Sequence, residues 1–154
     1  MNIVRAQQKH TAEVLSLLDA FRTYVNRQLE DPDFEESRTA RNDGEQLLRE
    51  RLEHDQTAVF LAMDAEIPAG IVTVHLVPLL RKGRYKAEVE EFFVIPEYHG
   101  TSAAKSLMDA ASEWAVSHNA ASMTLDSANG LDRAHAFYRK YGFAEDGKAF
   151  SRSL

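Results

Sequence analysis

The segment from Glu88 to Met108 constrains the fold more than any other part of the sequence. Residues 88–94 (EVEEFFV) are typical of a strand, residues 95–102 contain a proline and a glycine and predict a loop, and a helical apolar pattern starts at residue 103. The first N–H groups of a helix have no partner within the helix, and the helix dipole makes that end positive. A strand that enters a helix through a tight loop therefore forms a place where phosphate can bind without a charged side chain.

Hydrophobic periodicity along the rest of the chain alternates between strand and helix patterns. The expected strands are residues 2–5, 57–63, 69–77, 88–94, 121–125 and 148–153; the expected helices are residues 11–28, 44–53, 103–118 and 131–140; and a basic hairpin tip is expected at residues 79–85. One βαβ unit in the second half makes part of the sheet parallel. We therefore expect a single α/β (α+β) domain over residues 1–154, with a mixed central sheet of about six or seven strands flanked by about four helices.

Composition excludes several classes of function. The chain has 18 basic and 24 acidic residues, a net charge of −6, which argues against a nucleic-acid partner. It contains no cysteine, so disulfides, thiolate nucleophiles and Cys-ligated zinc are excluded, and its histidines show no metal-ligand spacing. No apolar run approaches the roughly 18 residues that span a bilayer, and the N-terminus lacks an apolar signal segment. We expect a cytoplasmic protein with no metal and no membrane partner.

The strand at residues 88–94 carries adjacent carboxylates. Val89, Phe92 and Val94 share one face only if the two-residue step is interrupted once, and a β-bulge at Glu90 and Glu91 does this. Bulges often lie beside active sites. The alternative is an ordinary irregularity at a sheet edge with two solvated glutamates.

A second motif, AHAFYRKYGF, spans residues 134–143. Ala134, Phe137, Tyr138 and Tyr141 lie at helical spacing, so one interpretation is an aromatic stripe that faces the core. Together with the strand, loop and helix at residues 88–108, however, this motif resembles the GNAT superfamily of acyl-CoA-dependent N-acyltransferases. Its Ala-His-x-Phe-Tyr form is similar to the aminoalkylphosphonate N-acetyltransferases, and the strand EEFFV is similar to that of the diamine and polyamine acetyltransferases.

The resemblance implies a GNAT-like fold and acetyl-CoA as cosubstrate. In that family the pantetheine arm enters beside the bulged strand, and the pyrophosphate motif is Gln/Arg-x-x-Gly-x-Gly/Ala. Here the motif falls on His99, Ser102 and Ala104, and only Ala104 conforms. Thr101 and Ser102 add hydroxyls and Lys105 adds a charge, whereas the alternative is a plain capped helix. The implied cofactor contacts are Phe92, Phe93, Val94, His99, Gly100, Thr101, Ser102, Ala103, Ala104, Lys105, Ala134 and Phe137.

The chemistry that the resemblance implies requires a base and an acid. An alkylamine with a pKa of about 10.4 is protonated at pH 7, and exposing its lone pair costs about 4.6 kcal/mol. Glu90 or Glu91 can accept that proton, directly or through a water. Tyr138, the tyrosine of the family's Phe-Tyr pair, is then placed to protonate the leaving thiolate, and backbone N–H near Val94 to hold the oxyanion.

An acidic segment at residues 30–36 offers a site for the acceptor. Asp31, Asp33 and Glu36 would receive a cationic substrate, although a charge run is often only solvated surface. We expect acetyl transfer to a primary amine, with a small cationic amine first and a protein N-terminus or an aminophosphonate still open. The alternative from another class is a non-catalytic acyl-CoA-binding or regulatory module. Family analogy also suggests a homodimer.

Overall fold

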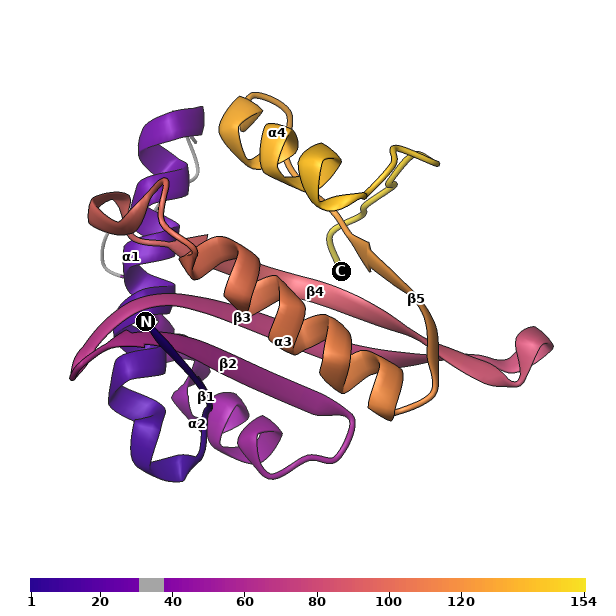
Figure 1. The fold of residues 1–154 in the computed structure, drawn as a ribbon, viewed down its shortest axis with the longest axis horizontal. Helices are drawn as coiled ribbons and strands as arrows, with labels where there is room; N and C mark the ends of the chain where they lie inside the picture. The colour runs from indigo at the N-terminus through magenta and orange to yellow at the C-terminus, as the bar shows by residue number, and fades with distance from the viewer. Residues whose placement is uncertain (31–37) are drawn as a thin grey trace.

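One mixed β-sheet organises the computed structural model, which describes residues 1–30 and 38–154 (Figure 1). Its five strands lie in chain order: β1 (Asn2–Arg5), β2 (Thr57–Asp64), β3 (Ile67–Leu79), β4 (Arg84–Val94) and β5 (Ala120–Leu125). The first four strands are antiparallel, whereas β4 and β5 are parallel. The crossover between β4 and β5 is the βαβ unit that the sequence predicts.

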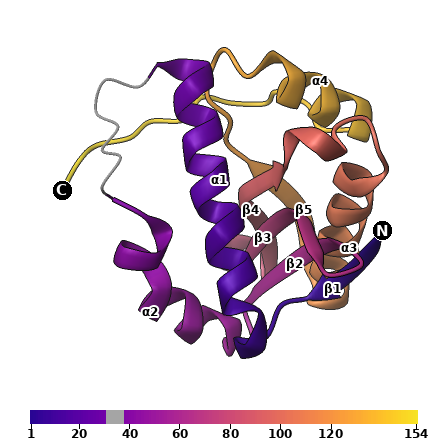
Figure 2. The ribbon, with the colours of Figure 1, turned by 90° about the vertical axis from the view of Figure 1, so that its left-hand side faces the viewer.

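Helices cover both faces of this sheet, as Figure 2 shows from the side. α1 (Thr11–Leu29) and α2 (Ala40–Leu52) pack on one face, where Val14 and Leu17 meet the buried side chains of Leu61 and Ile71. α3 (Ala103–Ser117) packs on the other face, and α4 (Asp132–Tyr141) adds aromatic side chains to the same apolar cluster. Because both faces are covered, β2 is buried almost continuously rather than at alternate positions.

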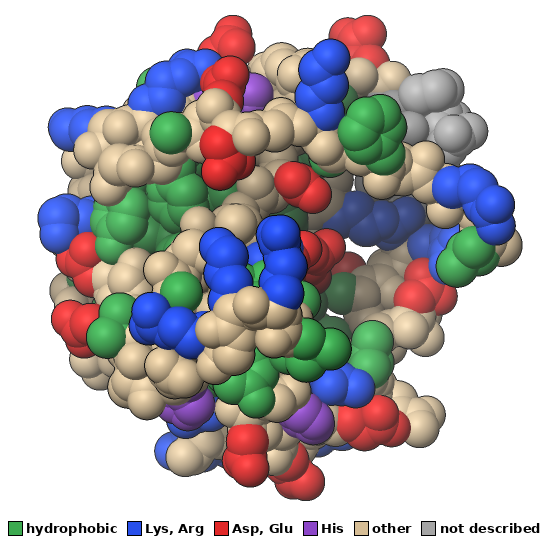
Figure 3. All heavy atoms as spheres, turned by 90° about the vertical axis from the view of Figure 1, so that its right-hand side faces the viewer, with side chains coloured by type: hydrophobic (Ala, Val, Ile, Leu, Met, Phe, Trp, Pro, Cys, Tyr) green, Lys and Arg blue, Asp and Glu red, His purple; other side chains and the backbone are tan. Residues whose placement is uncertain are grey.

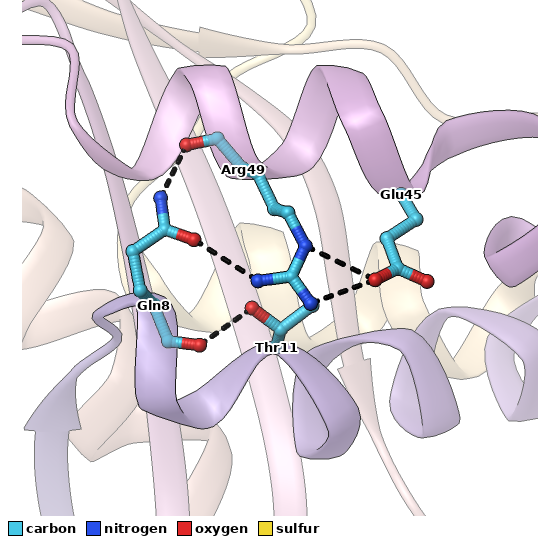
Figure 4. A network of polar contacts seen from close by, with 4 residues as sticks. All are labelled: Gln8, Thr11, Glu45 and Arg49. Carbon is cyan, nitrogen blue, oxygen red and sulfur yellow. Dashed lines mark hydrogen bonds and ion pairs between the residues drawn. The ribbon is translucent and has the colours of Figure 1, made fainter.

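The position of α2 depends on polar contacts with the start of α1 (Figure 4). The side-chain amide of Gln8 donates to the backbone oxygen of Arg49 (2.6 Å), and Arg49 in turn donates to Glu45 (2.7 Å). The Thr11 hydroxyl donates to the backbone oxygen of Gln8 (2.7 Å), which fixes the first turn of α1. Of these bonds, the one between Gln8 and Arg49 links α2 to the turn before α1, whereas the Thr11 bond lies within the start of α1 and the Glu45 bond lies within α2.

Two expectations about the elements are wrong. No strand forms at residues 148–153: this tail lies in solvent, with Phe150 91% exposed, and it buries no apolar surface that would offset the entropy lost on ordering. The sheet therefore has five strands rather than six or seven. In addition, α2 begins at Ala40 rather than at residue 44, because the Thr39 hydroxyl accepts a hydrogen bond from the Asn42 amide (3.1 Å) and caps the helix.

Two other expectations about the elements are confirmed, the cap of α4 and the basic hairpin tip. α4 ends at Gly142, whose φ of 112° is the left-handed conformation of a helix cap. The basic segment around Gly83 forms the tip of the long β3–β4 hairpin, which projects at the right of Figure 1. Among the described residues, no helix is long and apolar enough to cross a bilayer, and no cluster of His, Asp or Glu could hold a metal ion.

Candidate active site

A β-bulge interrupts β4 at the predicted position. Val72 on β3 pairs with Phe92 and Val74 pairs with Val89, so Thr73 alone faces both Glu90 and Glu91. Beyond the bulge, Phe92 and Val94 contact the α3 side of the core, as predicted. Phe93 points to the other face, where it stacks on Phe21 at 5.5 Å between ring centroids.

The bulge coincides with the separation of β4 from β5. The parallel ladder ends at the pair Val89 and Leu125, whereas β4 continues to Val94 in its pairing with β3. β5 meanwhile turns away toward α4 (Figure 1). Within residues 1–30 and 38–154, the edge of β4 from Glu90 to Val94 consequently has no strand partner on that side.

A cavity of about 910 Å³ lies over this gap, and we call it the donor cavity. The β4 edge forms its floor, α1 and the loop before α3 form one wall, and α4 with the β5–α4 loop forms the other. Apart from Ala103, which is buried, all the cofactor-site residues predicted from the sequence line it, together with Tyr138 and Glu90. Residues that the sequence did not single out also line it: Phe21, Tyr24, Val25, Asp126, Ser127, Arg133 and Lys140.

Backbone amides at the start of α3 face this cavity. Among the described residues, the amides of Gly100, Ser102, Ala104 and Lys105 have no hydrogen-bond acceptor. The Ala103 amide is satisfied by the Thr101 hydroxyl (3.2 Å), which also donates to the Tyr98 carbonyl (2.7 Å). Unpaired amides at the positive end of a 15-residue helix suit a phosphate group.

Ser102 fits the loop without the glycine that the family motif has there. Its φ is −74°, which any L-residue adopts, so no left-handed conformation requires glycine at this position. The left-handed position is Gly100 instead, with a φ of 81°. The departure from the motif at Ser102 therefore introduces no backbone strain.

The charged groups predicted for phosphate have other partners in this structure. His99 Nε2 lies 2.8 Å from the Val94 carbonyl, so its ring turns back toward β4. Lys105 Nζ forms an ion pair with Asp109 (2.6 Å), and that hydrogen bond raises the pKa of Lys105 and lowers the pKa of Asp109. Asp109 also accepts from the Tyr141 hydroxyl (2.9 Å). Among the groups predicted for phosphate, the backbone amides and the Ser102 hydroxyl thus remain available.

Tyr138 lies among aromatic rings at the opposite wall. Its ring centroid is 5.9 Å from that of Phe137, 6.0 Å from that of Phe143 and 6.1 Å from that of Phe92. Burial raises the pKa of Tyr138 to about 12. The hydroxyl therefore stays protonated throughout the physiological range and is a proton donor rather than a base.

A second cavity, of about 1140 Å³, lies on the other face of the sheet beneath α1 and α2, and we call it the acceptor cavity. Glu90, Phe21 and Val25 line both cavities, so the two spaces meet at the bulge. Glu91 lines only the acceptor cavity, where the Thr73 hydroxyl donates to Glu91 Oε2. Figure 3 shows the hollow on this side, with basic and acidic side chains at its walls.

Polar side chains from separate elements line the acceptor cavity. On its floor, the Thr57 hydroxyl lies 3.1 Å from Nδ1 of His75, whose side chain is half-buried. Arg22 from α1 and Arg51 from α2 line its walls, together with an ion pair between Arg38 and Asp43 at 3.1 Å. The sequence did not indicate these residues. The predicted acceptor residues Asp31, Asp33 and Glu36 lie outside the described residues.

The geometry offers room for an extended ligand along the free edge of β4 and for a polar molecule on the other face of the sheet. Comparison with known families agrees: a model described as the acetyltransferase (GNAT) family matches residues 22–143. The chain therefore belongs to the GNAT family of acetyltransferases. Acetyl-CoA is the donor that this family uses.

Solved structures share the fold at low sequence identity. A mutant of the BH1408 protein from Bacillus halodurans superposes with a TM-score of 0.82 at 20% identity, covering 100% of this chain and 99% of that one. An aminoglycoside acetyltransferase from an uncultured soil metagenomic sample gives 0.80 at 17% identity, covering 99% and 95%. A ribosomal-protein-alanine N-acetyltransferase from Brucella melitensis gives 0.74 at 16% identity, covering 100% of both. A comparison with curated protein sequences finds no match.

Proposed function

We propose that this protein transfers an acetyl group from acetyl-CoA to a primary amine. The observation that carries the proposal is the meeting of the two cavities at Glu90, where β4 separates from β5. A donor in one cavity and an amine in the other can approach each other there. Acetyl-CoA supplies the activated acyl group as a thioester.

Residues of the donor cavity fit such a ligand. Unpaired amides at Gly100, Ser102, Ala104 and Lys105 match the pyrophosphate, and the free edge of β4 from Phe92 to Val94 offers backbone groups to an amide-bearing arm. Phe137 packs 5.2 Å from Phe92 and closes the apolar wall beside the arm. The Val94 amide lies on the same edge and would donate to the oxyanion that develops on the acetyl carbonyl.

Proton transfers are assigned to three side chains. Glu90 or Glu91 accepts a proton from the substrate ammonium group, and the neutral amine then attacks the acetyl carbon. Glu90 lines both cavities, and Glu91 faces the acceptor cavity alone. Tyr138 donates its hydroxyl proton to the sulfur as the carbon–sulfur bond breaks, and its phenolate then takes up, directly or through water, the second proton that the acylated nitrogen releases.

We propose a primary amine as the acceptor, and two candidates differ in the other charged groups that this amine carries. Our first proposal is a small cationic amine, since Glu90 and Glu91 both attract an ammonium group. Arg22 of α1 and Arg51 of α2 line the walls of the acceptor cavity, and they favour a second candidate, an amine that also carries a carboxylate or phosphonate. An aminophosphonate or a peptide N-terminus belongs to that candidate.

A CoA-release assay tests the function directly. The panel should contain diamines and polyamines, aminoglycosides, amino acids, aminophosphonates and short peptides. Glu90→Gln and Glu91→Gln are tested beside the wild type: the variant that lacks the base loses at least about tenfold at pH 7 and recovers toward pH 10, where the free amine is abundant. Binding of CoA without acetylation of any amine would favour the non-catalytic acyl-CoA-binding or regulatory module.

A further inference from the structure

We propose that Thr73 is a positioning residue, which fixes the β4 bulge so that Glu90 and Glu91 both face the acceptor cavity. The inference rests on the proposed function, because it assigns a role in deprotonating the amine. Adjacent residues of a regular strand point to opposite faces of the sheet. Here Thr73 alone lies opposite two residues, Glu90 and Glu91, and both glutamates line the same cavity.

The Thr73 hydroxyl makes both contacts that hold this arrangement. It accepts a hydrogen bond from the Glu91 amide at 2.9 Å and donates one to Glu91 Oε2. The bulge removes the Glu91 amide from the regular ladder, and no other acceptor for it is found within residues 1–30 and 38–154. Since Thr73 is only 5% exposed, water does not readily replace its hydroxyl.

The hydrogen bond from Thr73 restricts the side chain of Glu91 and leaves that of Glu90 unrestrained. Oε2 of Glu91 is held by Thr73, which leaves Oε1 to accept a proton from the substrate ammonium group. Glu90 is exposed, and it makes no hydrogen bond or ion pair with any part of the chain that the structure describes. A held carboxylate has a defined direction and a low entropic cost of alignment. Thr73 therefore makes Glu91 the oriented proton acceptor.

Three variants separate positioning from general stability. Thr73→Val keeps the shape and removes the hydroxyl, Thr73→Ser keeps the hydroxyl, and Thr11→Val removes a buried hydroxyl at the start of α1, outside both cavities. We expect Thr73→Val to lower kcat/KM for the amine at least about tenfold at pH 7, with less loss at pH 10, where roughly a quarter of an amine with a pKa of about 10.4 is already deprotonated. Thr73→Ser and Thr11→Val should stay within about threefold of wild type.

CoA affinity, measured by calorimetry, should be the same in all three variants. Any of three outcomes would overturn the inference. Thr73→Val could show wild-type turnover, it could lose the same factor at pH 7 and pH 10, or Thr73→Ser could lose as much as Thr73→Val. Thr73→Ala serves with the same readouts if the valine variant does not fold.

Amide hydrogen exchange tests the bulge without any substrate. In ¹⁵N-labelled protein, the Glu91 amide should exchange at least about tenfold faster in Thr73→Val than in wild type, while amides of α3 keep their rates. Unchanged exchange at Glu91 would contradict the role of Thr73. If wild type acetylates no amine on the panel, the proposed function fails and the proton-transfer role fails with it, whereas the exchange rates still decide whether Thr73 holds the bulge.

Discussion

Tyr138 shows how burial selects a role for one side chain. Its pKa of about 12 keeps the phenol protonated. Transfer of the phenol proton to a thiolate of reference pKa about 8.5 then costs about 5 kcal/mol. This cost is smaller where the same apolar site also raises the pKa of the thiol. Helical spacing indicated that Tyr138 lies on an aromatic stripe, but only the packed rings show that its environment is dry.

We predict that Tyr138→Phe lowers kcat by about 10²–10⁴-fold and leaves CoA affinity unchanged, because the ring remains and only the proton donor is lost. Stopped-flow or steady-state assays with calorimetry measure the two quantities. Tyr85→Phe, a matched loss of hydroxyl outside both cavities, should behave like wild type. Since the pKa is raised, wild-type activity should also show no loss from phenol ionisation between pH 8 and pH 10. Turnover within twofold of wild type in Tyr138→Phe would remove it from the mechanism.

At the scale of elements, the sequence pattern predicted those helices and strands that contacts between nearby residues stabilise. The stripe of α3, with Leu107, Met108 and Ala111 fully buried, follows from helical spacing alone. The start of α2 could not be predicted from helical spacing, because residues 40–43 contain few apolar side chains and the cap at Thr39 decides the boundary. The tail at residues 148–153 contains two adjacent apolar side chains, Ala149 and Phe150, but a strand also needs a neighbouring strand and a face to bury.

The contact of α3 with the sheet depends on Gly70 of β3. A Cβ there would lie 2.8 Å from the Phe93 carbonyl oxygen and 3.1 Å from Leu107 Cδ1. We predict that Gly70→Ala destabilises the protein by about 1–3 kcal/mol, because backbone must move to relieve the overlap. Gly44→Ala in α2, where no atom lies within 4 Å of the new Cβ, should be neutral or stabilising. Thermal or urea unfolding of both variants tests this, and equal stability of the two would contradict it.

At the scale of the whole molecule, the two cavities differ in how far the sequence predicted them. Much of the donor cavity comes from two nearly continuous segments, residues 89–105 and 125–141, so motifs could indicate it. The acceptor cavity brings Arg22, Thr57, Thr73 and Glu91 together from four elements, and no motif spans them. Its shape depends on how α1 and α2 pack, which is a tertiary property. The residues predicted for the donor therefore come together in one cavity, whereas no sequence motif could indicate those of the acceptor cavity.

Binding of CoA should stabilise the whole fold, because the donor cavity joins α1, β4, α3 and α4. At a ligand concentration one hundred times Kd, the gain is about 2.7 kcal/mol, which corresponds to a rise in Tm of about 5–10 °C for a chain of this length. Scanning calorimetry measures this rise in Tm.

Ser102→Ala should keep CoA affinity within about threefold, since the amide remains and the hydroxyl makes no capping bond. A loss of tenfold or more would make the Ser102 hydroxyl a phosphate ligand, and no thermal shift at millimolar CoA would count against the donor cavity as the CoA site.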